Sequence, residues 1–228
     1  MFYDLENPMK FIKDISDSLD QDGVFIAQLM CLKSMLNQND LGNICHEHLE
    51  FYTFKSLKYL FENNGLKIFK VEENDINGGS YRIFCKKNIA KSINYKENTS
   101  IKYVKKFLKR VEDNKQKLTK FIKKQSLDKK KVFIYGASTK GNTLLQYYKI
   151  DNKIVPYAAE RSPEKIGKYT IGSGIKIISE EKARSYKPDF FIVLPYGFIK
   201  EFIIREKQWL KSGGKFILPY PKFKIISK

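Results

Sequence analysis

Cysteine and histidine are scarce in this chain, with three and two among its 228 residues. The cysteines, Cys31, Cys45 and Cys85, have no paired spacing, which argues against a disulfide framework and fits a reducing compartment. The sequence also lacks apolar runs as long as a membrane span. Its first residues, MFYDLENP, carry acids in place of a secretory signal. We therefore expect a cytoplasmic protein with no membrane partner.

Positive charge is in excess, at a formal +18, and this raises the hypothesis of a nucleic-acid partner. More than half of that charge lies between Lys91 and Lys130, where fourteen Lys/Arg accompany four Asp/Glu. Apolar residues recur there at helical spacing, so we expect a basic amphipathic linking helix over 91–130. The segment has neither aromatic stacking platforms nor a known reading motif, which disfavours nucleic-acid binding.

The regions on either side of this helix favour an α/β fold. Residues 1–90 predict a helix from Pro8, a strand over Val24–Leu29, a helix capped by Thr53 and a hairpin. After residue 130, apolar strands expected over ranges such as 132–135, 153–158 and 215–218 alternate with helices, the last of them near 198–210. This is the pattern of a doubly wound, mainly parallel sheet. The first region lacks the strand, glycine-rich loop and helix with which many α/β domains begin. The pattern predicts that the chain starts within a fold.

The densest polar cluster is Cys45-His46-Glu47-His48, which holds both histidines of the chain. In an extended segment His46 and His48 share a face while Glu47 points away. A metal site is disfavoured because the spacing matches neither His-Glu-x-x-His nor Cys-x-x-Cys. Two alternatives stay open: acid/base catalysis by an imidazole beside a carboxylate, or a loop whose histidines only bond backbone carbonyls.

The sequence GASTKGNT, residues 136–143, lies between an expected strand and an expected helix. Backbone N–H groups at such a turn form a cradle for phosphate. A nucleoside-triphosphate loop needs lysine where this chain has Asn142, and a dinucleotide fingerprint needs glycine where it has Ser138. Lys140 and Gly141 complete a loop that suits another anionic ligand. The alternative is a strand-to-helix turn that binds nothing.

Other loops carry side chains that hydrogen-bond phosphate or sugar oxygens, or glycines that let a ligand approach the backbone. They are Asn77, Gly78, Gly79, Ser80 and Arg82 in the hairpin turn, and Lys165, Tyr169 and Tyr196 in loops expected at the carboxyl edge of the second sheet. Ligands of doubly wound sheets bind at that edge. A plain hairpin turn is the alternative for the first group.

Five segments, taken in order, resemble the SAM-dependent C-methyltransferases that act on nucleotide-linked keto-deoxysugars. They are DLENP (Asp4–Pro8), CHEHLEFYT (Cys45–Thr53), NGGSYR (Asn77–Arg82), YGASTKGNT (Tyr135–Thr143) and LPYGF (Leu194–Phe198). The resemblance covers essentially the whole chain. It implies the later half of a SAM-binding Rossmann-like domain at 1–90 and a Rossmann-like substrate-binding domain at 131–228. The zinc-binding domain and the SAM loop of the family have no counterpart here.

The resemblance also implies roles for the candidate residues. His48 would remove a proton from the carbon next to the ketone, with Glu47 and His46 beside it, and the enolate would take the methyl group of S-adenosylmethionine. The turn at 77–82 and the loop at 138–142 would face the sugar nucleotide. Cys45 departs from the tyrosine that relatives often carry. No metal is expected in this chain.

Because half of the expected SAM domain is missing, a separately encoded N-terminal half is an expected partner. The competing hypothesis is a non-catalytic nucleotide-sugar-binding module left by truncation. A basic nucleic-acid-binding protein is the third, and the distribution of charge favours it least.

Overall fold

The computed structural model describes residues 2–227, apart from the side chain of Asn77, and it forms two compact units. Unit 1 comprises Met1–Gln38 and His46–Lys106, and unit 2 comprises Asn39–Cys45 and Phe107–Lys228. The short segment 39–45 therefore belongs to the unit formed mainly by the C-terminal half of the chain. Each unit has its own sheet and its own hydrophobic core.

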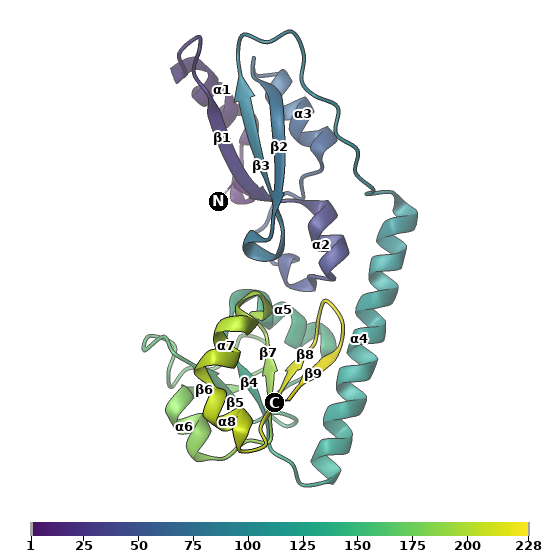
Figure 1. Ribbon diagram of the computed structural model, residues 1–228, viewed down its shortest axis with the longest axis vertical. Helices are drawn as coiled ribbons and strands as arrows, with labels where there is room; N and C mark the ends of the chain where they lie inside the picture. The colour runs from purple at the N-terminus through teal and green to yellow at the C-terminus, as the bar shows by residue number, and fades with distance from the viewer. Residues whose placement is uncertain (1, 228) are drawn as a thin grey trace. The chain divides into compact units, whose positions relative to one another are not determined.

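Unit 1 is a small antiparallel sheet with helices on one face (Figure 1). Its elements are η1 (Phe2–Asp4), α1 (Pro8–Ser18), β1 (Phe25–Met30), α2 (Leu32–Gln38), α3 (Phe54–Glu62), β2 (Lys67–Asn74), η3 (Ile76–Gly78) and β3 (Ser80–Lys86). The strand order is β1-β3-β2, and both pairs are antiparallel. Alternate residues of the strands, such as Leu29 and Ile83, pack with Leu57 of α3 and Ile12 of α1. One face of the sheet therefore forms the core.

The helices of unit 1 begin where capping residues satisfy their first N–H groups. The side chain of Asn7 accepts a hydrogen bond from the N–H of Lys10, and Pro8 stands in the first turn of α1. Thr53 and Ser56 form a reciprocal capping box at α3. These are the helix starts that the sequence predicts at Pro8 and Thr53.

Unit 2 is a doubly wound α/β domain with a six-stranded, mainly parallel sheet. Its elements are η2 (Leu41–Asn43), most of α4 (Ile101–Leu127), β4 (Val132–Tyr135), α5 (Thr139–Tyr148), β5 (Tyr157–Glu160), β6 (Lys176–Ser179), α6 (Glu180–Ser185), β7 (Phe190–Val193), η4 (Tyr196–Phe198), α7 (Ile199–Arg205), α8 (Lys207–Lys211), β8 (Lys215–Leu218) and β9 (Lys224–Ile226). The order is β6-β5-β4-β7-β8-β9, and only β9 pairs in the antiparallel direction. The Rossmann-like arrangement predicted for the C-terminal region is confirmed.

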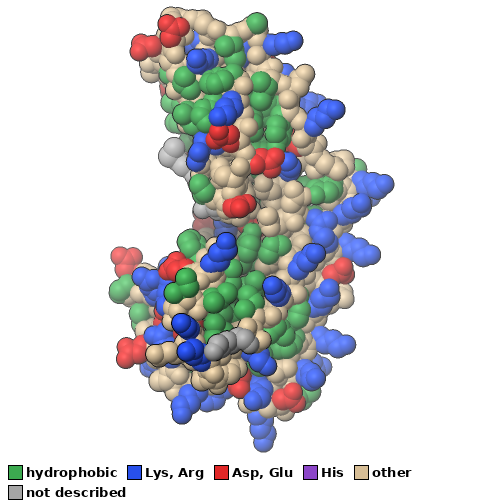
Figure 2. Space-filling model, in the orientation of Figure 1, with side chains coloured by type: hydrophobic (Ala, Val, Ile, Leu, Met, Phe, Trp, Pro, Cys, Tyr) green, Lys and Arg blue, Asp and Glu red, His purple; other side chains and the backbone are tan. Residues whose placement is uncertain are grey.

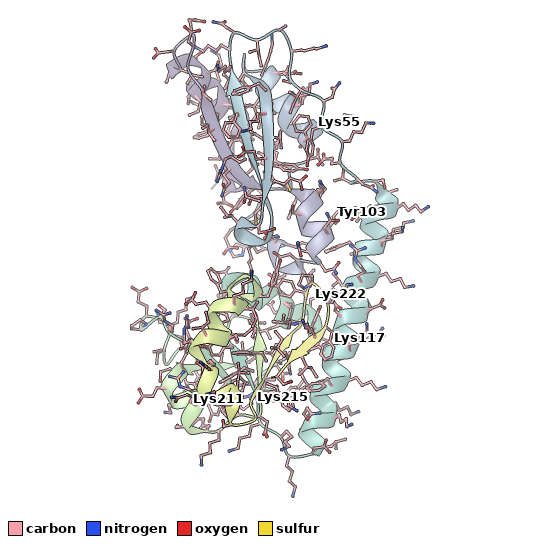
Figure 3. All side chains as sticks on the ribbon, in the orientation of Figure 1. Lys55, Tyr103, Lys117, Lys211, Lys215 and Lys222 are labelled. Carbon is pink, nitrogen blue, oxygen red and sulfur yellow. The ribbon has the colours of Figure 1, made fainter. Side chains whose placement is uncertain are left out.

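Helix α4 covers residues 101–127 of the expected 91–130, and residues 91–100 have no regular secondary structure. Its buried face includes Phe107, Val111 and Leu118. Lysines follow the opposite side of the helix in Figure 2, and the labelled Lys117 projects away from it in Figure 3. No helix within residues 2–227 combines the length and the apolarity needed to cross a membrane.

Two details of unit 2 differ from the sequence pattern. Strand β5 begins at Tyr157 because Asp151–Ile154 closes a turn in which Asp151 accepts from the N–H groups of Lys153 and Ile154. The helix expected near 198–210 is divided at Glu206 into α7 and α8. The carboxylate of Glu206 accepts hydrogen bonds from the Tyr135 hydroxyl at 2.9 Å and from Arg184 at 2.6 Å.

Replacing Glu206 tests this buried junction. Glu206→Ala removes the acceptor of a buried tyrosine hydroxyl, so we expect the free energy of unfolding, measured in urea, to fall by roughly 1–3 kcal/mol. Glu206→Gln, which keeps one acceptor oxygen, should lose less. Glu201→Ala, at an exposed ion pair with Arg205, is the control and should change stability by less than about 1 kcal/mol. Equal losses in the alanine variants would contradict this account.

Candidate functional site

Three chain segments meet at the carboxyl end of β1 in unit 1. The N–H of Leu32, just after the strand, donates to the carbonyl of Tyr52 at 2.9 Å. The turn before β3 approaches α2 so closely that a Cβ on Gly79 would lie 2.5 Å from Cβ of Ser34. Gly79 also has a φ of +117°, which side-chain-bearing residues rarely adopt. The segment 46–53 and the turn 76–79 are thus both held at this edge of the sheet.

Tyr3, which sequence reasoning missed, holds the histidine segment in place. Its carbonyl accepts hydrogen bonds from the N–H groups of Leu49 and Glu50 at 2.9 and 3.2 Å. Its ring meets the imidazole of His48 edge-on, with 4.5 Å between the ring centroids. The neighbouring Phe2 is buried in the core. Tyr3 therefore holds the backbone that follows half-buried His48 through Leu49 and Glu50, and it packs against the His48 ring.

His46 and Glu47 form a turn rather than an extended segment. Nδ1 of His46 lies 3.3 Å from the Glu47 carboxylate, and the His46 side chain is 91% exposed. The alternation assumed for an extended strand therefore does not apply here. His46 pairs with Glu47, and His48 is the histidine held against the body of unit 1.

Tyr52 brings a buried hydroxyl to the same segment. Its side chain packs against Phe2, with ring centroids 5.3 Å apart, and only 5% of the residue is exposed. Among the residues that the structure describes, none lies within hydrogen-bond distance of this hydroxyl. Burial, with a smaller effect of the Glu50 carboxylate, raises the pKa of Tyr52 to about 12.

The hairpin residues expected to bind ligand are engaged within unit 1. The Ser80 hydroxyl donates to the carbonyl of Ile76 at 2.8 Å and closes the turn. Arg82 donates to the side chain of Gln28 and lies 3.6 Å from Glu72 across the strands. The turn glycines Gly78 and Gly79 keep positive φ values, and the side chain of Asn77 lies outside the described part.

The loop after β4 has the form of a tight strand-to-helix turn. Gly136 has a φ of +84°, and a Cβ there would lie 2.6 Å from Pro195, which follows β7. A Cβ on Gly141 would lie 2.5 Å from Leu194, so glycine lets α5 pack closely on β7. Ser138 caps α5 by accepting from the N–H of Gly141 at 3.1 Å. Strands β4 and β7 flank the point where the strand order reverses, which is where doubly wound sheets bind ligands.

Glu160 at the end of β5 is a second residue that sequence reasoning missed. One carboxylate oxygen accepts from the N–H of Ala137 at 2.9 Å, and the other accepts from those of Arg161 and Ser162. Lys165 donates to the carbonyl of Ala137 at 3.0 Å and lies 4.0 Å from Glu160. This cluster joins the loops after β4 and β5. The only signal for Glu160 in the sequence was the position of an acidic residue 24 places after Gly136.

The other predicted residues of unit 2 do not all come together. Lys140 lies 3.7 Å from the buried carboxylate of Asp40, so its charge is balanced within unit 2. Asn142 occupies the first turn of α5, where its N–H donates to the carbonyl of Ser138. Tyr196, which follows β7, packs edge-on against the ring of Tyr220. Tyr169 pairs with Lys176, the first residue of β6, and so lies away from the carboxyl edge.

A metal site is not supported by the described residues. Within residues 2–227, no group of three His, Cys, Asp or Glu side chains is arranged to hold a metal ion. The three cysteines are free, and burial raises the pKa of Cys85 to about 12.

Comparison with known proteins places these features in a family. The family model for the C-methyltransferase C-terminal domain matches residues 75–221. The C-methyltransferase NovU of Streptomyces niveus is 29% identical over 228 residues, an alignment that covers 95% of this chain and 54% of the relative. The chain therefore spans about half the length of that relative.

Replacing Glu160 tests the loop junction of unit 2. Glu160→Ala removes the acceptor of three backbone N–H groups, and each such bond contributes about 1 kcal/mol. We expect hydrogen exchange at Ala137, Arg161 and Ser162 to become roughly fivefold faster. Glu164→Ala, at an exposed acid of the same loop, should leave these rates unchanged. Unaltered exchange in the Glu160 variant would show that the carboxylate does not hold the loops.

Replacing Tyr52 tests the buried hydroxyl through the pH dependence of stability. Between pH 10 and pH 12 the unfolded chain loses the Tyr52 proton while the folded chain retains it, so the free energy of unfolding falls as pH rises. Tyr52→Phe should remove this part of the decline and cost no stability at pH 7, because the lost hydroxyl has no partner. Tyr59→Phe, at a ring 69% exposed, is the matched control. Urea unfolding at both pH values measures the difference.

Proposed function

Because the chain belongs to the C-methyltransferase family whose C-terminal domain it matches, we propose that it carries the base and substrate-binding part of a SAM-dependent sugar C-methyltransferase. The substrate would be a nucleotide-linked keto-deoxysugar. The observation that carries the proposal is half-buried His48, whose ring packs edge-on against Tyr3 and whose next two residues, Leu49 and Glu50, donate backbone hydrogen bonds to the Tyr3 carbonyl. The resemblance of CHEHLEFYT to the family gives this histidine the role of the base.

The chemistry follows from the acidity of a C–H bond next to a ketone. A neutral nitrogen of His48 would take the proton, and the bonding electrons would move onto the ketone oxygen as an enolate. Edge-on packing against Tyr3 restricts rotation of the imidazole and favours one orientation for proton transfer. General-base catalysis of this kind contributes roughly 10²–10⁴ in rate.

S-adenosylmethionine would supply the methyl group to the enolate carbon and leave as a thioether. The described part of unit 1 contains no strand, glycine-rich loop and helix that would hold this cofactor. Its site would therefore be formed largely by the part of the family proteins that does not align with this chain. The residues here are assigned only to the proton and to the substrate.

The nucleotide would bind at the carboxyl edge of unit 2. Support comes from the loop 136–142, which lies where the strand order reverses and is kept in shape by Glu160 and Lys165. The N-terminus of α5 at Ser138 would attract an anionic group. A nucleotide-sugar-binding module without catalysis uses the same loop, so it is the second candidate function.

Proton exchange separates the two functions. The chain is combined with the cofactor-binding half of a family member and incubated in D₂O with a nucleoside-diphosphate ketosugar. We expect His48→Ala to slow deuterium uptake at the carbon next to the ketone by about 10²–10⁴. Nucleotide affinity, measured by calorimetry, should stay within about twofold. Lys55→Gln, at an exposed residue of α3 labelled in Figure 3, is the control.

A His48→Ala variant that still exchanges the proton at the parental rate would remove the catalytic role. If neither the parental chain nor the His48→Ala variant catalyses exchange while both bind the nucleotide, the chain functions as a nucleotide-sugar-binding module without catalysis.

A further inference from the structure

Residues 39–45, which we call the strap, belong to unit 2 although the chain on both sides of them belongs to unit 1. The first five residues of the strap are buried. The side-chain amide of Asn39 donates to the carbonyl of Pro221 at 2.6 Å, and its oxygen accepts from Arg110 of α4 at 2.8 Å. Hydrogen bonds to two distant parts of the chain therefore fasten the strap to unit 2.

The strap also packs against the first turn of α5. A Cβ on Gly42 would lie 2.7 Å from both Cβ and the carbonyl oxygen of Lys140, the second residue of α5. Nζ of Lys140 lies 3.7 Å from the carboxylate of Asp40, whose side chain is 2% exposed. That carboxylate also accepts from the side-chain amide of Asn43 at 3.0 Å. Close backbone packing and an ion pair thus join the strap to the loop 136–142.

The histidine segment begins where the strap ends, because the chain passes from unit 2 into unit 1 directly after Cys45. The N–H of Ile44 closes a turn within the strap at 3.0 Å, and in unit 1 the N–H of Leu49 donates to the carbonyl of Tyr3 at 2.9 Å. Only four residues, His48 among them, separate these two points. A chain spans at most about 3.6 Å per residue, so this stretch cannot absorb a large shift of the strap.

We propose that the strap restrains the histidine segment from unit 2, with Asp40 as a positioning residue for His48, so that a ligand bound at the loop 136–142 also restrains the base. Such a ligand orders Lys140 and the first turn of α5, and the strap packed on that turn is ordered with it. Two events that share one cost of ordering favour each other. The inference rests on the proposed function, which assigns the nucleotide to this loop and the proton to His48.

Amide hydrogen exchange of the full chain measures the restraint. The common nucleoside diphosphates are added in turn, and binding is followed by calorimetry. We expect residues 46–50 to exchange about threefold more slowly, or slower still, with a nucleotide bound. In Asp40→Asn this slowing should disappear, while the affinity falls no more than about twofold because Lys140 keeps its charge. Asp189→Asn, at a carboxylate 3.1 Å from Lys130 in the same unit, is the matched control and should respond as the parent does.

Gly42→Ala tests the restraint without a ligand. The added methyl group must move the strap away from the carbonyl of Lys140, so we expect residues 46–50 to exchange about fivefold faster in the ligand-free chain. Gly197→Ala is the matched control, because a Cβ there meets no atom within 4 Å, and it should leave these rates unchanged.

Kinetics separates positioning from a loss of folding. In the D₂O reaction with the cofactor-binding half, Asp40→Asn should lower the turnover number about tenfold and leave KM within about twofold. Exchange over 46–50 that ignores Gly42→Ala, or that responds equally to Asp189→Asn, would overturn the restraint. A chain that binds none of the nucleotides would overturn the response to ligand. A restraint seen in a parental chain that takes up no deuterium would leave the strap standing and remove the proposed function. Uptake that Asp40→Asn leaves at the parental rate would do the reverse.

Discussion

One-sided burial of the sheet in unit 1 is the constraint on which the candidate site depends. Because Ala27, Leu29 and Ile83 must face α1 and α3, the strands have one permitted register, and a slip by one residue would expose the whole apolar set. That register places the end of β1, the end of β2 and the start of β3 at one edge. Tyr3 and the histidine segment are then fixed to this edge through the buried ring of Phe2.

Several glutamate carboxylates stabilise the fold of this strongly basic protein by accepting hydrogen bonds. Glu97 accepts from the N–H of Phe54 at the start of α3 and from the hydroxyl of Tyr81, and so ties an extended segment to the core of unit 1. Glu160 and Glu206 bind backbone N–H groups and a tyrosine hydroxyl in unit 2. Hydrogen bonds that a buried carboxylate accepts from the protein replace the hydrogen bonds to water that it loses on burial. The net charge of +18 therefore does not show that individual glutamates stabilise both units.

Much of the fold follows from local pattern. Strands over 132–135 and 215–218, and helices beginning near Pro8 and Thr53, lie where the sequence places them, since their residues combine apolar runs with capping or turn residues. The break at Glu206 was not predicted because it depends on Tyr135, which lies 71 residues away. Strand β9 was also not predicted, although it pairs with the neighbouring β8. At the candidate site, the histidine segment stood out for its composition, whereas the roles of Tyr3 and Glu160 consist of backbone hydrogen bonds that leave no mark on spacing.

The sequence by itself determined the class of the second half as a doubly wound α/β domain, the likeness of five ordered segments to C-methyltransferases, and the residues that carry titratable chemistry. Only the tertiary structure decided that His48, and not His46, is held against the body of unit 1, and that Lys140 and Lys165 neutralise carboxylates. It also decided the strand order β1-β3-β2 of the first sheet. The physical reason is that such contacts depend on how the chain folds back on itself. Tyr3 meets His48 and Asp40 meets Lys140 across long stretches of sequence, and local pattern cannot report which partners meet.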